Sequence, residues 1–316
     1  NGGRLQLNGG TYHVLGEPNP TAGETANGLI ALGGTAGVND GVIVASGLTI
    51  TTEGTGSRGV MAGSTVGSAG TSGQIYLSGS SVTVNGVDAV AGEVAYGSIL
   101  ETTGSVLTST RGAGIRLVDG ATVNLNSTQI SAAQETVVSS FDSAGQMQRI
   151  TIGDGSVAAS NNGTLLLVDR GVDGGDGVVE LVLGNGSTTS GDIIDESGNK
   201  TTGGTDVTVE EQASWAGALR GVRNFFSEAG GDISFEGEAD IQGDLNGNGT
   251  NFTFSDQGGQ ISGNVVLSQS SRTTGGGIAT PITVGGDVDV DGTSFMGGNW
   301  AIGGNLSSAG TISPGN

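Results

Sequence analysis

The chain has 316 residues, of which 64 are glycine and only 4 are proline, and it contains no cysteine. Collagen needs glycine at every third position with abundant proline, so it is excluded, and without cysteine there is no disulfide framework. With 10 Lys and Arg against 31 Asp and Glu, the net charge of −21 argues against nucleic acid or an anionic membrane surface as a partner.

Short aliphatic clusters recur along the whole chain, and 34% of the residues are hydrophobic. Disordered chains rich in Gly, Ser, Thr and Asn lack such a supply of aliphatic residues, so we expect folded β-structure. No run of about 18 apolar residues occurs, and we expect no direct membrane insertion of this fragment. No signal peptide is visible at Asn1, which suggests a mature or trimmed fragment.

The first predicted strands surround Ile43, Ile50 and Val60 and precede an expected insertion from Ser64 to Gly73. A repeat with a period of about 24 residues then begins. Each unit has a leading aliphatic residue, a second one seven positions later and a third about eight positions after that. The predicted triplets are Ile75, Val82 and Val90; Ile99, Val106 and Ile115; Val123, Ile130 and Val138; and Ile150, Val157 and Leu165.

Apolar residues alternate with small or polar ones within each cluster, as in Val82-Thr83-Val84, and this alternation is the period of a β-strand. Pairs that favour tight turns separate the clusters. They include Asn85-Gly86, Asp119-Gly120, Asp154-Gly155 and Asn162-Gly163.

From about Gly171 the regular register is harder to follow, and a second insertion is expected from Gly184 to Thr205. The best candidate for a helix, from Gln212 to Phe226, contains two glycines and no cap, so no helix is predicted. Strands are still expected at residues 206–209, 232–235 and 287–290.

Three short strands per period, separated by tight turns, predict an all-β fold: a right-handed, three-sided parallel β-helix with about 24 residues per coil. We expect a single domain over residues 1–316, with regular coils at about 40–170 and less regular coils with inserted loops at 171–316. About thirteen coils at ~4.8 Å each would give a rod on the order of 60 Å long. Glycine is expected in the turns, where positive φ angles are needed.

Other all-β folds fit the repeat less well. A sandwich or propeller is built from antiparallel hairpins with longer periods. A calcium-binding β-roll needs tandem Gly-Gly-x-Gly-x-Asp nonapeptides, and residues 172–178 offer a single imperfect copy.

Several stretches resemble the passenger repeats of pertactin-like autotransporters. They are LTITTEGTGSRGVMAG (Leu48–Gly63), SILETTGSVLTSTRGAGIRLVDGATVNL (Ser98–Leu125), VTVEEQASWAGAL (Val207–Leu219) and GGNLSSAGTISPGN (Gly303–Asn316). The first two have a Thr- and Ser-rich strand, a short Gly turn and an aliphatic strand. The third is similar to a Trp-Xaa-Gly coil of that family, and the last to the segment that leads into its autochaperone region.

This resemblance implies type V secretion and exposure at the cell surface or outside a Gram-negative bacterium. It implies a C-terminal translocator β-barrel in the outer membrane, following Asn316 in the full-length protein. Most such passengers are adhesins or self-association proteins with roles in biofilm formation or virulence, and a minority are enzymes. The expected partners are a host-cell or bacterial surface protein or glycan, or a second copy that meets the first through polar ladders of Asn, Thr, Ser and Asp.

The residue inventory argues against an enzyme. The only histidine, His13, is far from a plausible triad, and one His without Cys makes Cys–His catalysis impossible and a zinc site improbable. Gly191-Asp192-Ile193 does not match the Gly-Asp-Ser-Gly of serine protease passengers, and the only lysine, Lys200, does not belong to a phosphate-binding loop. We predict no catalytic residues, no cofactor and no metal ligands.

The alternative is a polysaccharide hydrolase or lyase, which would use clustered carboxylates. Acidic residues crowd the stretch from Asp169 to Asp256. One cluster combines Asp173 and Asp176 with Arg170. The other consists of Glu236, Glu238, Asp240 and Asp244; it alternates with apolar or small residues and is expected on the solvent face of one strand. Whether the acidic half binds Ca²⁺ is left open.

Aromatic residues concentrate late in the chain, and stacking in the core is their expected role. Phe252 and Phe254 have strand spacing, which places both rings on one face. Arg220 and Arg223 could form a small mixed patch with the neighbouring aromatic rings. The late aromatic residues are Trp215, Phe225, Phe226, Phe235, Phe252, Phe254, Phe295 and Trp300. A rigid spacer that holds another domain away from the cell is a third hypothesis.

Overall fold

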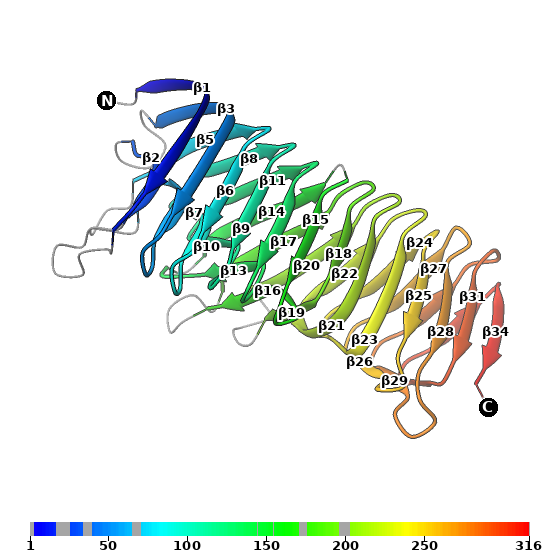
Figure 1. The fold of residues 1–316 in the computed structure, drawn as a ribbon. Helices are drawn as coiled ribbons and strands as arrows, with labels where there is room; N and C mark the ends of the chain where they lie inside the picture. The colour runs from blue at the N-terminus through cyan, green and yellow to red at the C-terminus, as the bar shows by residue number, and fades with distance from the viewer. Residues whose placement is uncertain are drawn as a thin grey trace.

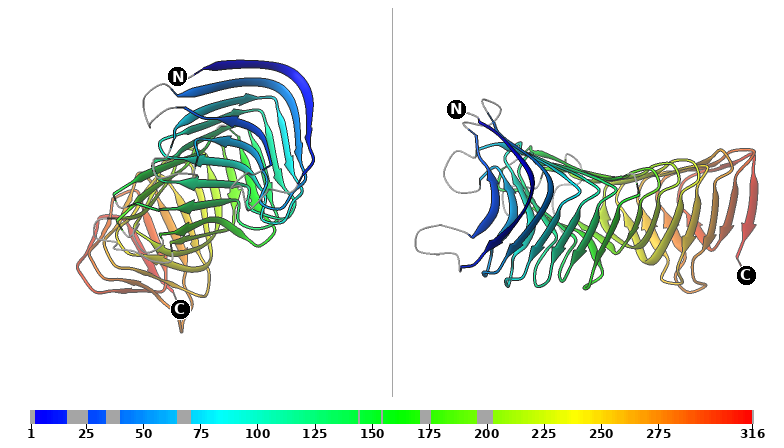
Figure 2. Two further views of the ribbon diagram at one scale, coloured as in Figure 1. Left: turned by 90° about the vertical axis from the view of Figure 1, so that its left-hand side faces the viewer. Right: turned by 45° about the horizontal axis from the view of Figure 1, so that its top comes forward.

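The computed structural model describes residues 3–16, 26–33, 40–64, 71–143, 145–153, 155–170, 176–195 and 203–315. They form an elongated stack of short parallel strands, with the two termini at opposite ends of the rod (Figure 1). Viewed from its N-terminal end, the chain turns clockwise as it recedes, so the coil is right-handed (Figure 2, left). Strands inside the rod pair with equivalent strands of the preceding and following coils, the strands at its two ends pair on one side, and all these pairings are parallel.

The strands form three faces, which we call A, B and C in chain order. Face A contains the first halves of β1 (Arg4–Val14) and β3 (Gly41–Thr52), then β5 (Gly73–Ser78), β8 (Ile99–Thr103), β11 (Thr122–Asn126), β14 (Met147–Gly153), β17 (Val178–Leu183), β20 (Gly204–Val209), β22 (Asn224–Ser227), β24 (Leu245–Asn248), β27 (Val265–Ser268), β30 (Val288–Val290) and β33 (Leu306–Ser308).

Face B contains the second halves of β1 and β3, then β6 (Ser81–Val84), β9 (Val106–Ser109), β12 (Gln129–Ala132), β15 (Val157–Ser160), β18 (Thr188–Ser190), the first halves of β21 (Ser214–Val222) and β23 (Asp232–Ile241), β25 (Asn251–Phe254), β28 (Arg272–Gly275), β31 (Phe295–Gly298) and β34 (Thr311–Pro314).

Face C contains β2 (Asn27–Ala31), β4 (Arg58–Ala62), β7 (Val90–Ala95), β10 (Ile115–Val118), β13 (Val137–Ser140), β16 (Thr164–Asp169), β19 (Asp192–Asp195), the second halves of β21 and β23, β26 (Gly259–Ile261), β29 (Ile282–Val284) and β32 (Trp300–Ile302).

The predicted parallel β-helix is therefore confirmed, and face A shows its coils directly. One position of this face recurs thirteen times along the described residues, each copy paired with the next. The column is Leu5, Ile43, Ile75, Leu100, Val123, Ile150, Leu181, Val207, Phe225, Leu245, Val265, Val288 and Leu306.

The predicted repeat is wrong by one residue at several places. Ile75 pairs with Leu100, one position later than predicted, and Leu100 pairs with Val123, so the next step is one position too short. A slip of one residue turns a side chain to the opposite face of its strand. The aliphatic residues that line the interior are consequently Leu100, Leu107, Val137 and Ala158, and the predicted Ile99, Val106, Val138 and Val157 point outward.

This error has a local cause. Ile99-Leu100, Val106-Leu107 and Val137-Val138 are adjacent pairs of aliphatic residues, so each pair offers an apolar side chain to both faces of its strand. Periodicity alone does not decide which member of such a pair is buried. The pairing with neighbouring coils decides it.

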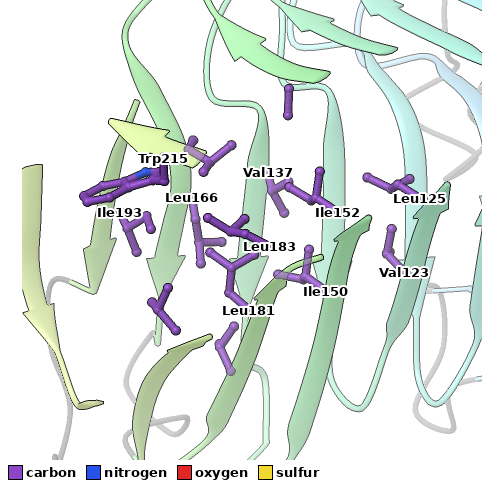
Figure 3. Packing of buried hydrophobic residues seen from close by; sticks show 14 of the residues in the cluster. Val123, Leu125, Val137, Ile150, Ile152, Leu166, Leu181, Leu183, Ile193 and Trp215 are labelled. Atoms are coloured by element: carbon purple, nitrogen blue, oxygen red, sulfur yellow. The ribbon is translucent and has the colours of Figure 1, made fainter. Parts of the chain in front are cut away.

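Inward side chains from the three faces form one continuous hydrophobic core. In the middle of the rod, Ile150 and Leu181 of face A lie in the same interior as Leu166 of face C (Figure 3). Burying an aliphatic side chain of this size contributes about 1.5–3 kcal/mol. A single coil cannot enclose such a core, so neighbouring coils stabilise one another.

Two further predictions concern segments without the repeat. No helix occurs in the described residues, and residues 212–226 lie in β21 and β22 and the turns beside them, as the absence of helix signals predicts. The insertion expected from Gly184 to Thr205 is wrong in part, because β18 and β19 are ordinary coil strands within it. Residues 65–70 of the first expected insertion, Asp154 and Asp173 lie outside the described residues.

Candidate functional site

The outer surface of face B is the most uniform exposed surface of the rod. Every second residue of its strands points to solvent, and the intervening residues are buried. From β3 to β21 the outward positions are occupied by small, hydroxylated or β-branched side chains and one glutamine. These residues are Thr49, Thr51, Ser81, Thr83, Val106, Thr108, Gln129, Ser131, Val157, Ala159, Thr188, Ser190, Ser214 and Ala216.

None of these residues carries a charge, although the chain has a net charge of −21. Their side chains are short, and the β-branched ones have restricted rotamers. Such a surface is rigid before it meets a partner, and little conformational entropy is lost when it is covered. Covering it also avoids the desolvation of ionised groups, which is costly.

The corner between faces A and B explains why face B stays regular. Its connections are short, from two residues at Gly79–Ser80 to four at residues 184–187. Gly79 has a φ of 50°, and the following Ser80 is buried. The Ser80 amide donates a hydrogen bond to the Ser105 hydroxyl of the next coil, at 3.2 Å.

The same arrangement recurs farther along the corner. Thr128 donates its amide N–H to the Ser156 hydroxyl at 3.0 Å, and Thr250 donates to the Ser271 hydroxyl at 3.2 Å. These buried hydroxyls satisfy backbone groups at the turn, where the strands leave them unpaired. A left-handed residue followed by Ser or Thr is a sequence signal for this corner.

Most of the longer connections along the chain do not adjoin face B. They join face C to face A and span residues 32–40, 63–72, 141–146, 170–177 and 196–203. None of the face B stretches begins or ends at these connections.

An open hollow of about 380 Å³ lies on face B between β18 and β25. Polar side chains from neighbouring coils form much of its lining. The lining residues are Thr188, Thr189, Ser190, Ser214, Trp215, Ala216, Asp232, Ile233, Ser234, Asn251 and Thr253.

Two charged side chains occupy outward positions in the paired part of face B beyond β21. Asp232 accepts a hydrogen bond from the Asn251 side-chain amide at 3.0 Å. Arg272 lies over the ring of Phe295, with its guanidinium carbon 4.1 Å from the ring centroid. Asp232 pairs with Asn251, and Asn251 pairs with Arg272, so the two charges lie one coil on either side of Asn251 in a single row.

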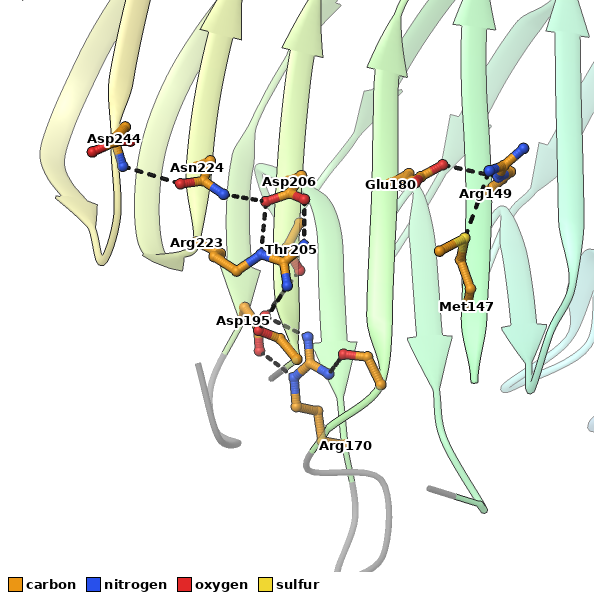
Figure 4. A network of polar contacts seen from close by, with 12 residues as sticks. Met147, Arg149, Arg170, Glu180, Asp195, Thr205, Asp206, Arg223, Asn224 and Asp244 are labelled. Carbon is orange, nitrogen blue, oxygen red and sulfur yellow. Dashed lines mark hydrogen bonds and ion pairs between the residues drawn. The ribbon is translucent and has the colours of Figure 1, made fainter. Parts of the chain in front are cut away.

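Arg170 and Asp176 of the first acidic cluster have separate partners. Arg170 is fully buried and makes two hydrogen bonds to Asp195, at 2.9 and 2.7 Å, while the Thr205 hydroxyl donates to the same carboxylate (Figure 4). Asp176 instead accepts a hydrogen bond from the Gly145 amide at 2.7 Å. Arg170 and Asp195 are therefore an ion pair inside the coil, a role that their separation in the sequence does not reveal.

The second acidic cluster is on the outside of the rod, as the alternation predicts for Glu236 and Glu238, which are exposed. Asp240 accepts a hydrogen bond from the Gly221 amide, and Asp244 accepts one from the Asn264 amide. Within the described ranges, no group of three or more His, Asp or Glu residues could hold a metal ion.

Other polar residues singled out from the sequence occupy separate places. His13 is exposed and lies 3.3 Å from Glu53, and hydrogen bonds from Asn85 and then His13 lower the pKa of Glu53. Arg223 pairs with Asp206, which raises the pKa of the guanidinium (Figure 4).

The predicted mixed patch is wrong, because Phe225 is buried and Arg220 lies on face C. Most of the late aromatic residues do stack in the core, as predicted. Phe235 contacts four rings, at centroid distances of 5.7, 5.6, 6.2 and 4.4 Å, and Phe252 and Phe254 both point inward.

A ladder of Asn and Asp side chains, which the predicted repeat does not include, follows the corner between faces C and A in the C-terminal coils. Each Asn or Asp side chain accepts a hydrogen bond from the backbone amide of its counterpart one coil later. Asp244 donates to Asn224 at 3.1 Å, Asn264 to Asp244 at 2.7 Å, Asp287 to Asn264 at 2.9 Å and Asn305 to Asp287 at 2.7 Å.

A glycine precedes most members of this Asx ladder, and packing explains it. A Cβ on Gly286 would lie 2.5 Å from the Asn264 side-chain oxygen and 2.6 Å from the Gly263 carbonyl oxygen. Gly286 has no positive φ, so close approach between coils requires this glycine. The signal was the recurring Gly-Asx-aliphatic triplet, at residues 243–245, 263–265, 286–288 and 304–306.

Known proteins offer no guide to these features. No family model matches the chain, and no curated protein or solved structure is significantly similar to it. In the part of the chain that the structure describes, there is no helix of the length and hydropathy that crossing a membrane requires.

Proposed function

We propose that this chain is the surface-exposed passenger of an exported, autotransporter-type protein and that it acts in adhesion or self-association. Recognition is non-covalent and uses the outer surface of face B. The partner is a protein or glycan on a host or bacterial surface, or a second copy of the chain. The proposal extends to export through the outer membrane of a Gram-negative bacterium.

The observation that carries this proposal is the continuous, uncharged outer surface from β3 to β21. Elsewhere the acidic side chains repel negatively charged partners, and most cell surfaces are negatively charged. Face B offers hydroxyl groups, which donate and accept hydrogen bonds, beside methyl groups, which contribute apolar contact. Repetition along the rod allows many weak contacts to form together, and multivalency then supplies the affinity.

The fold itself suits such a role. A β-helix places equivalent side chains ~4.8 Å apart along its axis, so a partner meets an extended, regular surface. The absence of cysteine agrees with passage through an oxidising periplasm in an unfolded state, where disulfides would obstruct the chain.

Display on cells tests the proposal. The chain is fused to a translocator barrel and displayed on a host that neither clumps nor attaches. We expect the displayed chain to cause clumping or attachment to epithelial cells or a coated surface. Display of the folded chain at high density with neither effect would contradict the proposal and favour a rigid spacer.

A matched pair of variants assigns the effect to face B. Replacing Thr108 and Ser190 by Glu adds two charges to face B, and replacing Thr151 and Thr208 by Glu adds two charges to the outside of face A. The first variant should lose at least about tenfold in attachment, since ionised groups would have to be desolvated. Equal losses in the two variants would contradict the assignment to face B.

A further inference from the structure

We propose that two copies of this chain bind each other through face B with their rods antiparallel. The two-fold axis lies between the two copies, parallel to the β25 strands and level with them. Asp232 of each copy then meets Arg272 of the other. The inference rests on the proposed function of face B, and it names the partner and the register.

The positions of the charges support this register. Among the outward residues of face B that pair with neighbouring coils, from Thr49 to Ser313, Asp232 is the only anion and Arg272 the only cation; the exposed Glu236 follows the paired residues 232–235 of β23. They lie in one row, one coil before and one coil after Asn251. A rotation of 180° about the β25 direction exchanges the coils on either side of β25 and keeps the row. It therefore brings each Asp232 opposite an Arg272 in a closed, self-complementary contact.

Both side chains are available for this contact. Each is exposed, and none of the ion pairs among the described residues involves Asp232 or Arg272. The Asn251 side-chain amide donates a hydrogen bond to one oxygen of Asp232, and the Asp232 residue remains exposed. The Phe295 ring supports the guanidinium of Arg272 from one side, which pre-organises it for a carboxylate on the other side.

The shape of face B supports the same register independently. The hollow of about 380 Å³ is lined by residues of β18, β21, β23 and β25. In the antiparallel arrangement the coils of β21 and β23 face the coils of β31 and β28 of the other copy. The Arg272–Phe295 pair of one copy therefore stands over the hollow of the other. The projecting pair and the hollow are complementary, and the contact forms twice.

A parallel arrangement lacks this agreement. A two-fold axis that lies in the contact and runs parallel to the rods would pair each coil with the same coil of the other copy. Asp232 would then lie near Asp232 of the other copy. Like charges at a contact are costly, so electrostatics selects the antiparallel register.

The extent of the contact sets its strength. Coils from β18 to β34 overlap in the proposed dimer, which corresponds to roughly 34 Å of rod at ~4.8 Å per coil. With two outward residues per coil, the contact belongs to the small, transient class. Detection consequently needs many copies on one surface, where multivalency raises the apparent affinity.

Beads coated with the purified 316-residue chain provide the test, with red and green beads counted in mixed clumps. Wild-type beads should clump. Beads carrying Asp232→Arg should not, because two arginines would face two arginines, and Arg272→Asp beads should not, because two aspartates would face two aspartates. Each single variant should clump at least about tenfold less than wild type.

Mixing beads that carry the two single variants tests the charge pairing most directly. The arginine introduced by Asp232→Arg then faces the aspartate introduced by Arg272→Asp, and the native Arg272 of the first variant faces the native Asp232 of the second. Mixed red–green clumps should therefore return. Control beads carrying Asp289→Arg on face A or Arg220→Asp on face C should clump as wild type does. A misfolded variant would not be rescued by mixing, so rescue separates the contact from a loss of fold.

The inference is overturned if wild-type beads stay dispersed, if either single variant clumps as wild type does, or if the mixture stays dispersed. Dispersed wild-type beads together with attachment of the displayed chain to foreign cells would refute the dimer and leave the proposed function standing. Clumping that is lost in the Thr108 and Ser190 double variant but unaffected by the charge reversals would support face B and refute this register.

Discussion

The N-terminal and C-terminal coils differ in their length and in the side chains that fill their interior. From Ile75 to Leu181 the inward column of face A advances by long and uneven steps, and aliphatic side chains fill the interior. From Val207 to Val265 its steps are shorter and nearly equal, and aromatic rings fill the interior. The coils in which the sequence repeat is clearest are therefore not the coils that are most uniform in length.

The two regions also close their corners differently. In the N-terminal coils the connections from face C to face A vary from three residues at 96–98 to ten at 63–72, while from β23 onward each has three residues and the Asx ladder follows this corner. The hydrogen bonds from backbone amides to Asn and Asp side chains hold these shorter coils in register. The difference suggests that the C-terminal region supplies rigidity, and that the N-terminal region supplies most of the uncharged outer surface of face B.

The largest effect is expected in the aromatic core. Phe235→Ala should lower the free energy of unfolding by about 3–5 kcal/mol, because it opens a cavity and removes contacts with four rings. Leu100→Ala in the aliphatic region, also fully buried, should cost about 2–5 kcal/mol. Denaturant unfolding checks both, and a Phe235→Ala loss below that of Leu100→Ala would contradict the comparison.

The buried ion pair lies close to the junction of the two regions. Arg170→Met leaves the Asp195 carboxylate buried without its cation, and breaking such a pair costs about 3–5 kcal/mol. Adding Asp195→Leu removes the stranded charge and should recover most of the loss. The double variant, measured in the same denaturant experiment, must be more stable than Arg170→Met alone; equal stability would argue against the pair.

A smaller effect tests the Asx ladder. Gly286→Ala should cost about 1–3 kcal/mol, because the added methyl group overlaps the Asn264 side chain and the Gly263 carbonyl. Gly292→Ala is the matched control, since its Cβ would lie 3.9 Å or more from any neighbour and its φ is not positive. Thermal unfolding should separate the two variants, and identical melting temperatures would contradict the packing explanation.

The smallest effect concerns pH at the N-terminal end. Hydrogen bonds from Asn85 and His13 lower the pKa of Glu53, so this carboxylate stabilises the fold at a pH above its unfolded pKa. That contribution is lost as the pH falls through the lower, folded pKa. Glu53→Gln should melt below wild type at pH 7, with the gap closing in acid. A gap that widens in acid would contradict the sign.

Much of the fold was predictable from sequence, because strand alternation and turn pairs are local signals. Three-sided coils and inward aromatic residues such as Phe252 follow from them. The exact inward residue did not follow where aliphatic residues are adjacent, as at Ile99-Leu100, because only pairing with the next coil decides it.

The polar contacts were less predictable. The partner of Arg170 lies one coil later in the chain, at an inward position of β19 where the strand pattern indicates an aliphatic residue. The Asx ladder was readable as Gly-Asx-aliphatic triplets, but its coils are too short for the period of the N-terminal repeat. The uncharged surface of face B emerges only after the register shows which residues point outward.

Whether face B is the recognition surface can be measured directly, because the chain contains no cysteine. Single cysteines at Ser131 on face B and at Thr151 on face A are labelled with a maleimide-linked polyethylene glycol, and attachment or clumping of the displayed chain is measured before and after labelling. We expect the polymer on residue 131 to abolish the effect and the polymer on residue 151 to leave it intact. Loss only from residue 151, or from neither position, would contradict it.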